Sequence, residues 1–304
     1  MLKPGPINKL MMRKKKLLVV PLAGLGNRMR VLSSCIQIAQ KEGYELSVAW
    51  PVNDELGCEL EDVFESIGYQ YTVPSKWKQK ILTNVYRTGL LNKYYGAFKF
   101  LSGLFYSRSV FDKDIKNFNQ AKINSDDSDV IVASCMAFSN DSFTPITLVD
   151  FLKNEANRDH FKRFVFNPKL VKQVDDEFSK IGEPYVGIHI RRTDHADIIK
   201  HSPDQNFIEK IDAIIADHPN QKFFLATDDP AVKKFYQAKY EGRIFTVNHK
   251  LSRVDVEGVY GAVIELLLLS RANGMICSMI SSYSNAAILI GDIKNVEYVD
   301  SFLA

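Results

Sequence analysis

The stretch that decides the fold lies in the second half of the chain, where residues 185–194 read YVGIHIRRTD. Its first six residues form an apolar run typical of a buried strand, and the polar residues after them mark the carboxyl end of that strand. The same succession of apolar strand, polar turn and amphipathic helix continues to about residue 290. Strands that alternate with helices at this spacing predict a parallel sheet covered by helices, so the fold class is α/β.

The other expected elements follow from the same patterns. In the second half we expect strands at residues 185–190, 222–226, 244–247 and 275–279, and helices at 204–217, 231–240, 256–271 and 284–290. In the first half, a strand at 16–22, a glycine turn, a helix that ends at Gly43 and a strand at 45–50 form one β-turn-α-β unit. Residues 75–125 predict irregular helices and loops, followed by a short strand at 130–132 and a helix from 168 to about 180.

The pattern predicts two domains. We place their boundary near residue 165, which divides the chain into residues 1–165 and 166–304. Two open α/β domains in series leave a cleft between them, and such a cleft is a usual place for a ligand.

Composition and charge exclude several classes of protein. The 304 residues carry 39 Lys and Arg against 36 Asp and Glu, and a net charge of +3 is too small to favour nucleic acid as a partner. No apolar run reaches the roughly 20 residues of a membrane span. The run at 13–20 imitates a signal peptide, but it is better interpreted as the start of a first strand. The four cysteines lack the spacing of a zinc site or a disulfide framework, which predicts a reducing compartment and a cytoplasmic location.

Polar side chains follow each predicted strand of the second half at the point where the strand ends. Ligands of doubly wound sheets lie beyond these carboxyl ends. Guanidinium groups, carboxylates and hydroxyls gathered there suit a phosphorylated, hydroxyl-rich ligand. The candidate residues at this edge are His189, Arg191, Arg192, Thr193, Asp194, Thr227, Asp228, Asp229, Asn248, His249, Ser281, Ser282, Tyr283 and Ser284.

Several of these residues also have a purely structural interpretation. Arg191 and Arg192 point in opposite directions if the strand continues, so one can enter the cleft while the other forms a surface salt bridge. His189 lies in an apolar strand, where a core histidine is the alternative. Asp229 precedes a proline and is explained as a helix cap, which leaves Asp228 as the expected ligand contact.

Glu265 is a carboxylate inside the apolar run 263–269. A helix this apolar must be largely buried, and a buried carboxylate costs several kcal/mol unless it has a partner. Glu265 therefore meets either a basic side chain or a ligand donor such as guanine, and the sequence leaves both interpretations open.

The run GLGNR at residues 24–28 lies between the first strand and the first helix. Backbone N–H groups at such a helix start favour an anion. Met29 stands where a dinucleotide fingerprint needs its third glycine, and no Gly-Lys-Ser/Thr follows, which disfavours an NAD enzyme or an NTPase. The Gly-x-Ser-x-Gly and His-Glu-x-x-His motifs are absent too, so a serine hydrolase or a zinc protease lacks support.

Three motifs in the second half carry a family resemblance. They read GIHIRRTD at 187–194, FLATDDP at 224–230, and a run from Gly261 to Ser282. Together with GLGNR they resemble the shared motifs of the α1,6-, α1,2- and protein-O-fucosyltransferase superfamily, closest to the α1,6 and nodulation-type branch. Residues 60–160 match nothing in it. The resemblance implies a GT-B fold, with two Rossmann-like domains facing each other across a cleft. It also implies inverting transfer of fucose from GDP-fucose without a metal or another cofactor.

The resemblance assigns roles residue by residue. It implies that Arg191 acts in catalysis on the β-phosphate of GDP and that His189 and Glu265 contact guanine. It further implies that Asp228 and Asp229 line the nucleoside pocket and that Ser281 or Ser282 hydrogen-bonds phosphate. The run GLGNR would be the N-terminal glycine loop. The full donor-binding set is His189, Arg191, Arg192, Asp194, Asp228, Asp229, Glu265, Ser281, Ser282, Gly24, Gly26 and Asn27.

One position departs from the family pattern. The α1,6 branch is expected to place a catalytic Glu five residues after the motif Asp, and this chain has Ile199 there. Asp197 is our first candidate to replace it as the base. Otherwise base catalysis is weak and the departing GDP drives the reaction.

These observations predict a fucosyltransferase that acts on a glycan or a lipid-linked oligosaccharide. The alternatives are a catalytically silent GDP-sugar-binding protein, which the missing Glu favours, and a Rossmann-type oxidoreductase. The basic and aromatic stretch 76–108 admits weak peripheral association with the inner face of a membrane. A solvated face with its aromatic residues in a core is the competing interpretation of that stretch.

Overall fold

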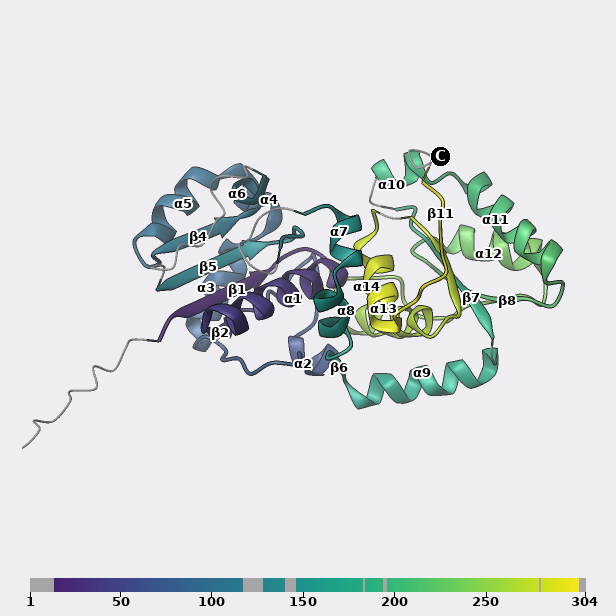
Figure 1. The fold of residues 1–304 in the computed structure, drawn as a ribbon, viewed down its shortest axis with the longest axis horizontal. Coiled ribbons are helices and arrows are strands. Elements are labelled where there is room, and N and C mark those ends of the chain that lie inside the picture. The colour runs from purple at the N-terminus through teal and green to yellow at the C-terminus, as the bar shows by residue number, and fades with distance from the viewer. Residues whose placement is uncertain are drawn as a thin grey trace, which may run out of the picture.

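The structure of the protein is a computed structural model, and it describes residues 14–116, 128–139, 146–182, 184–193, 196–278 and 280–300. Figure 1 shows two lobes side by side, the N-terminal half on the left and the C-terminal half on the right. Each lobe is built on its own parallel sheet.

The N-terminal sheet has the strand order β2-β1-β5-β4, and its strands run parallel. The predicted β-turn-α-β unit is confirmed, and its helix α1 (Leu25–Glu42) ends at Gly43, whose φ of +73° is left-handed. The strands of this sheet are β1 (Lys16–Pro21), β2 (Glu45–Val48), β4 (Arg108–Phe111) and β5 (Asp129–Ser134).

Helices cover both faces of this sheet. Alternate β1 residues point to opposite sides, so Leu17 packs toward α1 while Leu18 packs with Tyr86, Leu91 and Phe111 on the other face. The stretch 75–125 is more regular than its pattern indicated, since its described part holds the edge strand β4 as well as short helices. These helices are α3 (Lys76–Val85), α4 (Thr88–Lys93), α5 (Tyr95–Gly103) and α6 (Asp112–Lys116).

Short elements connect the two sheets. Strands β3 and β6 pair antiparallel, and α9 then packs against the buried helix α13 of the second half. The Asn167 side chain caps the start of α9 by accepting from Lys169 N. The connecting elements are α2 (Leu60–Val63), β3 (Phe64–Ser66), α7 (Leu148–Lys153), α8 (Glu155–Phe161), β6 (Val165–Phe166) and α9 (Pro168–Ile181).

The C-terminal sheet has the order β11-β10-β7-β8-β9 and is also parallel. The expected strands and helices of this half are present within a few residues of their predicted bounds, and the helix α10 and the edge strand β11 are additional. Its strands are β7 (Tyr185–Ile190), β8 (Lys222–Thr227), β9 (Ile244–Phe245), β10 (Gly274–Cys277) and β11 (Val296–Tyr298). Its helices are α10 (Ala196–His201), α11 (Asp204–Asp217), α12 (Pro230–Lys239), α13 (Val256–Ser270) and α14 (Ser282–Gly291).

The two halves meet where α1 packs against α14. A Cβ atom on Gly26 would lie 2.5 Å from the Ser282 carbonyl oxygen, so glycine permits this close approach. Gly57 has the same role in a neighbouring loop, where a Cβ would lie 2.3 Å from the Val254 carbonyl oxygen. These contacts hold the start of α1 beside the carboxyl edge of the C-terminal sheet.

Candidate functional site

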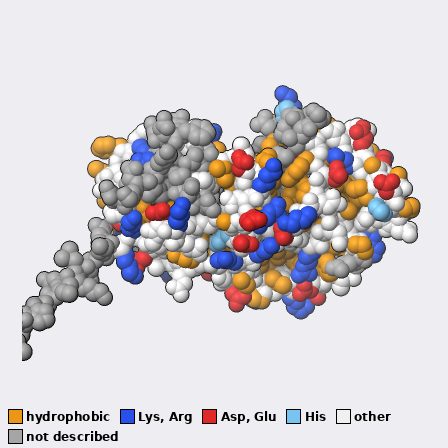
Figure 2. Space-filling model, viewed as in Figure 1, with side chains coloured by type: hydrophobic (Ala, Val, Ile, Leu, Met, Phe, Trp, Pro, Cys, Tyr) orange, Lys and Arg blue, Asp and Glu red, His pale blue; other side chains and the backbone are white. Residues whose placement is uncertain are grey.

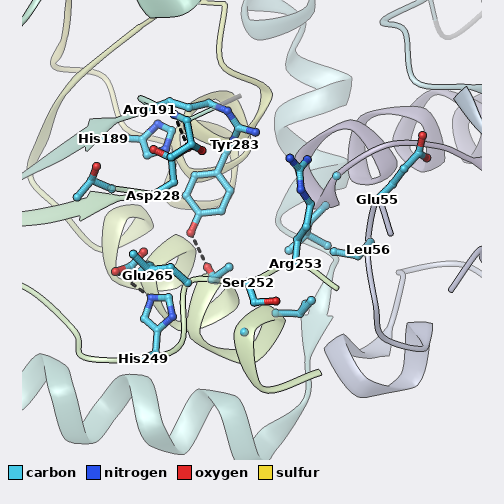
Figure 3. Close-up of a pocket in the computed structure, with 18 residues that line it drawn as sticks. Glu55, Leu56, His189, Arg191, Asp228, His249, Ser252, Arg253, Glu265 and Tyr283 are labelled. Carbon is cyan, nitrogen blue, oxygen red and sulfur yellow. Dashed lines mark hydrogen bonds and ion pairs between the residues drawn. The ribbon is translucent and has the colours of Figure 1, made fainter. Parts of the chain in front are cut away.

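A cavity of about 420 Å³ lies where the carboxyl ends of β7 and β8 face the start of α1. Both halves of the chain contribute to its walls (Figure 3). The lining residues are Gly24, Leu25, Glu55, Leu56, His189, Arg191, Thr193, Thr227, Asp228, His249, Leu251, Ser252, Arg253, Gly258, Val259, Ala262, Glu265 and Tyr283.

Two guanidinium groups line this cavity. Arg191 follows β7, and Arg253 comes from the segment between β9 and α13; in Figure 3 both side chains extend toward the same space. The Gly57 N–H donates to the Arg253 carbonyl at 2.7 Å, which anchors that loop to the N-terminal half. Two cations at one cavity suit a diphosphate. Sequence reasoning missed Arg253 because it belongs to no motif and lies in a loop.

His189 forms part of the cavity wall as a buried, neutral imidazole. Its Nδ1 lies 2.7 Å from the Ser284 Oγ, and its ring packs on Tyr283 with the centroids 4.9 Å apart. Burial, reinforced by the positive charge of Arg191, lowers the pKa of His189 to about 3. His189 can therefore form part of the wall and can donate one hydrogen bond and accept another, but it carries no positive charge near neutral pH.

Asp228 lines the cavity and also shapes the loop after β7. Its carboxylate accepts from the Arg192 N–H at 2.7 Å and from the Thr193 hydroxyl at 2.6 Å. Because the Arg192 N–H is the next donor along the backbone from Arg191, this contact helps to fix where Arg191 leaves the strand.

Glu265 meets basic side chains, the first of the two interpretations left open by the sequence. Its Oε1 lies 3.1 Å from His249 Nε2 and 3.6 Å from Lys233 Nζ. The other imidazole nitrogen, Nδ1, lies 2.9 Å from the Lys250 carbonyl oxygen, so both ring nitrogens face acceptors, as an imidazolium requires. Burial alone would lower the pKa of His249, but Glu265 and this carbonyl outweigh it and raise the pKa.

Gly261 allows this pairing. It lies one helical turn before Glu265 on α13, and a Cβ on it would stand 2.1 Å from the His249 ring. The glycine of the third motif thus lets the His249 ring approach the helix closely and reach the carboxylate.

The turn before α1 is held in an unusual conformation. Ala23 has φ +64°, a left-handed value that is costly for a residue with a Cβ. Its N–H donates to Glu55 Oε2 at 2.9 Å, and its carbonyl accepts from Arg28 Nε at 2.7 Å. These two bonds aim Gly24 at the cavity. Sequence reasoning missed Glu55, which lies far from every motif.

Some predicted site residues lie outside the cavity lining. The Arg192 guanidinium bonds Asp204 at 2.6 Å and the Ser202 carbonyl at 2.9 Å, and it packs on the Phe207 ring. Arg192 therefore takes the salt-bridge alternative, and its guanidinium supports the loop rather than lining the cavity. Asp229 caps α12 by accepting from the Ala231 N–H at 2.7 Å, so the interpretation of this residue as a helix cap is confirmed.

The N-terminal and serine candidates divide in the same way. Gly24 lines the cavity, whereas Gly26 packs against α14 and the Asn27 amide oxygen accepts from Arg30 at 2.7 Å. Ser281 caps α14 by accepting from the Ser284 N–H, and Ser282 is the first residue of that helix.

The region of the predicted base is described in part. Asp194 lies outside the described residues, and Asp197 lies in α10 but its side chain is outside the description. Ile199, on the same helix, is 37% exposed and does not line the cavity. In the described ranges, no group of three or more His, Cys, Asp or Glu residues is placed to hold a metal ion.

Comparison with known proteins identifies the fold. No family model matches the chain. The fucosyltransferase NodZ from Bradyrhizobium is 17% identical with a TM-score of 0.59, over 92% of this chain and 94% of that one. A FUT1 variant from Arabidopsis thaliana in complex with GDP is 15% identical with a TM-score of 0.57, over 93% of this chain and 70% of that one. POFUT1 in complex with GDP-fucose is 10% identical with a TM-score of 0.53, over 96% of this chain and 99% of that one.

The two parallel sheets with a cavity between them define an α/β protein of the GT-B class, as the sequence predicted. Within that class, the chain shares its fold with the solved structures of the fucosyltransferase NodZ and of POFUT1.

Proposed function

We propose that the protein is an inverting glycosyltransferase that transfers fucose from GDP-fucose to a glycan acceptor. The observation that carries this proposal is the position of Arg191: it directly follows β7 and lines a cavity to which both halves of the chain contribute. The fold adds support, because solved structures that share it include one of NodZ with GDP and one of POFUT1 with GDP-fucose.

In the proposed reaction, an acceptor hydroxyl attacks the anomeric carbon of fucose from the face opposite the diphosphate. The bond from that carbon to the β-phosphate oxygen breaks, and GDP leaves with the electron pair. Arg191 stabilises the charge that grows on the diphosphate, and such a preorganised donor contributes roughly 3–4 kcal/mol to lowering the barrier. We propose Arg253 as a second cation on the same group, because it lines the same cavity from the other side.

The acceptor must also lose a proton. We propose Asp197 as the base, since Ile199 at the family position has no group that can take a proton. Asp197→Asn should then reduce the turnover rate while leaving GDP binding unchanged. Full turnover by Asp197→Asn would refute the proposal that Asp197 is the base.

The nucleoside end has a matching set of groups. Guanine presents N–H donors, and Glu265 offers a carboxylate that is held in place by His249 and Lys233. Neutral His189 and Gly24 complete the proposed donor site without adding charge, while Asp228 lines it and orders the loop that carries Arg191.

A thermal-shift panel with GDP, UDP, ADP, CMP and NAD tests the donor. A ligand at about 100 times its Kd stabilises the protein by roughly 2.7 kcal/mol, which raises the unfolding midpoint by several degrees. A shift with GDP alone supports the proposal, whereas a shift with NAD and none with GDP favours an oxidoreductase. A GDP shift without transfer to any acceptor in a glycan panel favours a silent binding protein.

Arg191→Ala tests the mechanism. We expect it to abolish transfer almost completely while the protein stays folded. Arg271→Ala is the matched control, because Arg271 is bonded to Asp175 on α9 and does not line the cavity. Turnover retained by a folded Arg191→Ala variant would refute the assignment.

We further propose that the acceptor is a glycan or a lipid-linked oligosaccharide and that transfer takes place on the cytoplasmic side. No helix in the described ranges is long and apolar enough to cross a membrane.

A further inference from the structure

Helix α5 is apolar, and only one side of it packs against the sheet: Tyr95 and Phe98 contact the core, whereas Ala97, Phe100 and Leu101 are exposed. It reads YGAFKFLSG, and among these nine described residues only Ser102 is buried. Phe100 on α5 is 71% exposed, and just after the helix Leu104 and Phe105 are 62% and 77% exposed. Phe100 and Leu104 are four residues apart, so they continue one stripe along the outer side of the helix. Large apolar side chains gathered in this way on a monomer mark an interaction surface.

Helix α3 adds to the same side of the molecule. Trp77 is 63% exposed and Ile81 is 54% exposed, again four residues apart. The segments that carry α3 and α5 cover one face of the N-terminal sheet, where the ring centroids of Tyr86 and Phe98 are 5.6 Å apart. Both helices therefore belong to the cover of this one face, and each carries exposed apolar side chains. Figure 2 shows hydrophobic side chains at the left edge of the molecule, where Figure 1 places α5.

The segment that carries α3, α4 and α5 has charged residues of one sign. Residues 66–111 contain seven Lys and Arg and no Asp or Glu; because the whole chain carries +3, the remaining residues together carry −4. Arg87 pairs with Asp54 and Lys99 with Asp114. The other lysines of α3 and α4 form no ion pair with a carboxylate in the described part of the chain; they are Lys76, Lys78, Lys80 and Lys93.

We infer that the outer side of α3, α4 and α5 docks the protein on an anionic membrane surface. Lysines are attracted to anionic headgroups, and Trp, Phe and Leu side chains enter the boundary between headgroups and acyl chains. A second copy of the chain would bring the same positive charges face to face, which disfavours self-association as the use of this surface. The aromatic residues of stretch 76–108 divide between the two interpretations. Tyr86, Tyr95, Phe98 and Tyr106 pack in or against a core, whereas Trp77, Phe100 and Phe105 are exposed, and these exposed rings favour the membrane.

The docking surface is joined directly to the wall of the cavity. Arg87, just before α4, pairs with Asp54 at 3.3 Å, and the Thr88 N–H donates to Glu55 Oε1 at 3.2 Å. Glu55 lines the cavity and holds the Ala23 turn. Docking would thus bring the cavity close to a lipid-linked acceptor. This last step rests on the proposed function, whereas membrane binding itself does not.

Co-sedimentation of the 304-residue chain with vesicles tests the proposal. We compare phosphatidylcholine vesicles with vesicles that also contain phosphatidylglycerol, at low and high salt. We expect binding to the anionic vesicles that weakens with salt. The triple variant K76Q/K78Q/K80Q should bind them on the order of 100-fold more weakly. The control K169Q/K234Q/K239Q makes the same change in net charge at exposed lysines elsewhere and should bind like the wild type.

Tryptophan fluorescence locates the contact. The chain has two Trp residues. Trp50 is 2% exposed and Trp77 is 63% exposed, so a blue shift on adding vesicles reports Trp77. We expect this shift with anionic vesicles and its loss in K76Q/K78Q/K80Q. Phe100→Ser combined with Phe105→Ser should also weaken binding, and because both rings are exposed the fold should remain intact.

Several outcomes would overturn the proposal. The wild type could bind no vesicle, or both lysine triples could lose binding equally, which would indicate a general effect of charge. Light scattering could instead show a lipid-independent dimer that the Phe100 and Phe105 substitutions dissociate, which would make the surface a contact between copies. The GDP thermal shift of each variant is measured in parallel. An unchanged shift separates failure of docking from failure of the proposed function.

Discussion

Replacing Arg28 by methionine tests how the cavity wall is built. Arg28 is fully buried in α1 (0% exposed), and its guanidinium lies over the Trp50 ring, 4.7 Å from the centroid. Its Nε donates to the Ala23 carbonyl at 2.7 Å, and its Nη1 donates to the Pro51 carbonyl at 2.5 Å. Burial lowers the pKa of Arg28 to about 10, so the side chain is still charged in neutral buffer.

The size of the effect follows from these two bonds. A hydrogen bond from a charged donor contributes about 1.5–3 kcal/mol, so losing both costs about 3–6 kcal/mol. Methionine fills most of the volume, which keeps any cavity small. The total stability of a folded protein is about 5–15 kcal/mol, so Arg28→Met should remove a large part of it. The Ala23 turn also loses one of its two anchors, and the GDP thermal shift should therefore shrink.

Urea unfolding followed by circular dichroism measures this loss. A decrease of this size lowers the midpoint by about 1.5–3 M if the slope is near 2 kcal/mol per M. Arg163→Met is the matched control, because Arg163 is exposed and its replacement should change stability by no more than about 0.5 kcal/mol. A loss below about 1 kcal/mol in Arg28→Met, with the GDP shift unchanged, would show that these bonds do not hold the turn.

Three other substitutions probe the site and its supports. The pKa of His249 is raised above its ordinary value of 6.5 in the folded protein. The pair with Glu265 therefore stabilises the folded protein fully at pH values below 6.5, and this stabilisation is lost as the pH rises through the pKa of the folded protein. The urea midpoint should therefore fall between pH 6 and pH 9 more steeply in the wild type than in His249→Gln. Gly26→Ala should lower stability by about 1–3 kcal/mol, measured by thermal unfolding, because its Cβ would lie 2.5 Å from the Ser282 carbonyl oxygen. Asp229→Ala should cost about 1 kcal/mol by removing the cap of α12, with the GDP shift unchanged.

A different result would contradict each of these three predictions. Equal pH slopes for the wild type and His249→Gln would mean that the ion pair does not titrate in this range. A Gly26→Ala variant as stable as the wild type would show that α1 and α14 can separate without cost. If Asp229→Ala loses the GDP shift instead of stability, the residue contacts the ligand and is more than a cap.

The sequence predicted elements with a strong local signal. The helix at 204–217 matches α11 residue for residue, and the strand at 185–190 matches β7. The edge strands β4 and β11 were missed because, at four and three residues, they are too short for an apolar pattern to distinguish them from a loop. Such strands form because a neighbouring strand offers hydrogen bonds, and the residues of the short strand itself do not indicate that this neighbour is present.

The candidate site shows the same division. Arg191, His189 and Asp228 were found because the carboxyl ends of adjacent parallel strands must meet at one edge of a sheet. Arg192 and Asp229 belong to the same motifs, but the structure gives both side chains structural partners. The motif marked the edge, and only the packing of neighbouring helices separated the residues that line the cavity from those that support it.

By itself the sequence determined the α/β class, the parallel C-terminal sheet and the edge where a ligand would bind, because apolar periodicity and helix caps are local properties. The tertiary structure alone decided that Arg253 and Glu55 join the cavity, that His249 partners Glu265, and that Phe100 on α5 and Phe105 just after it face solvent. These facts depend on contacts between residues far apart in the chain. Which long-range contacts form is decided by how all the elements pack together, and no short stretch of sequence contains that information.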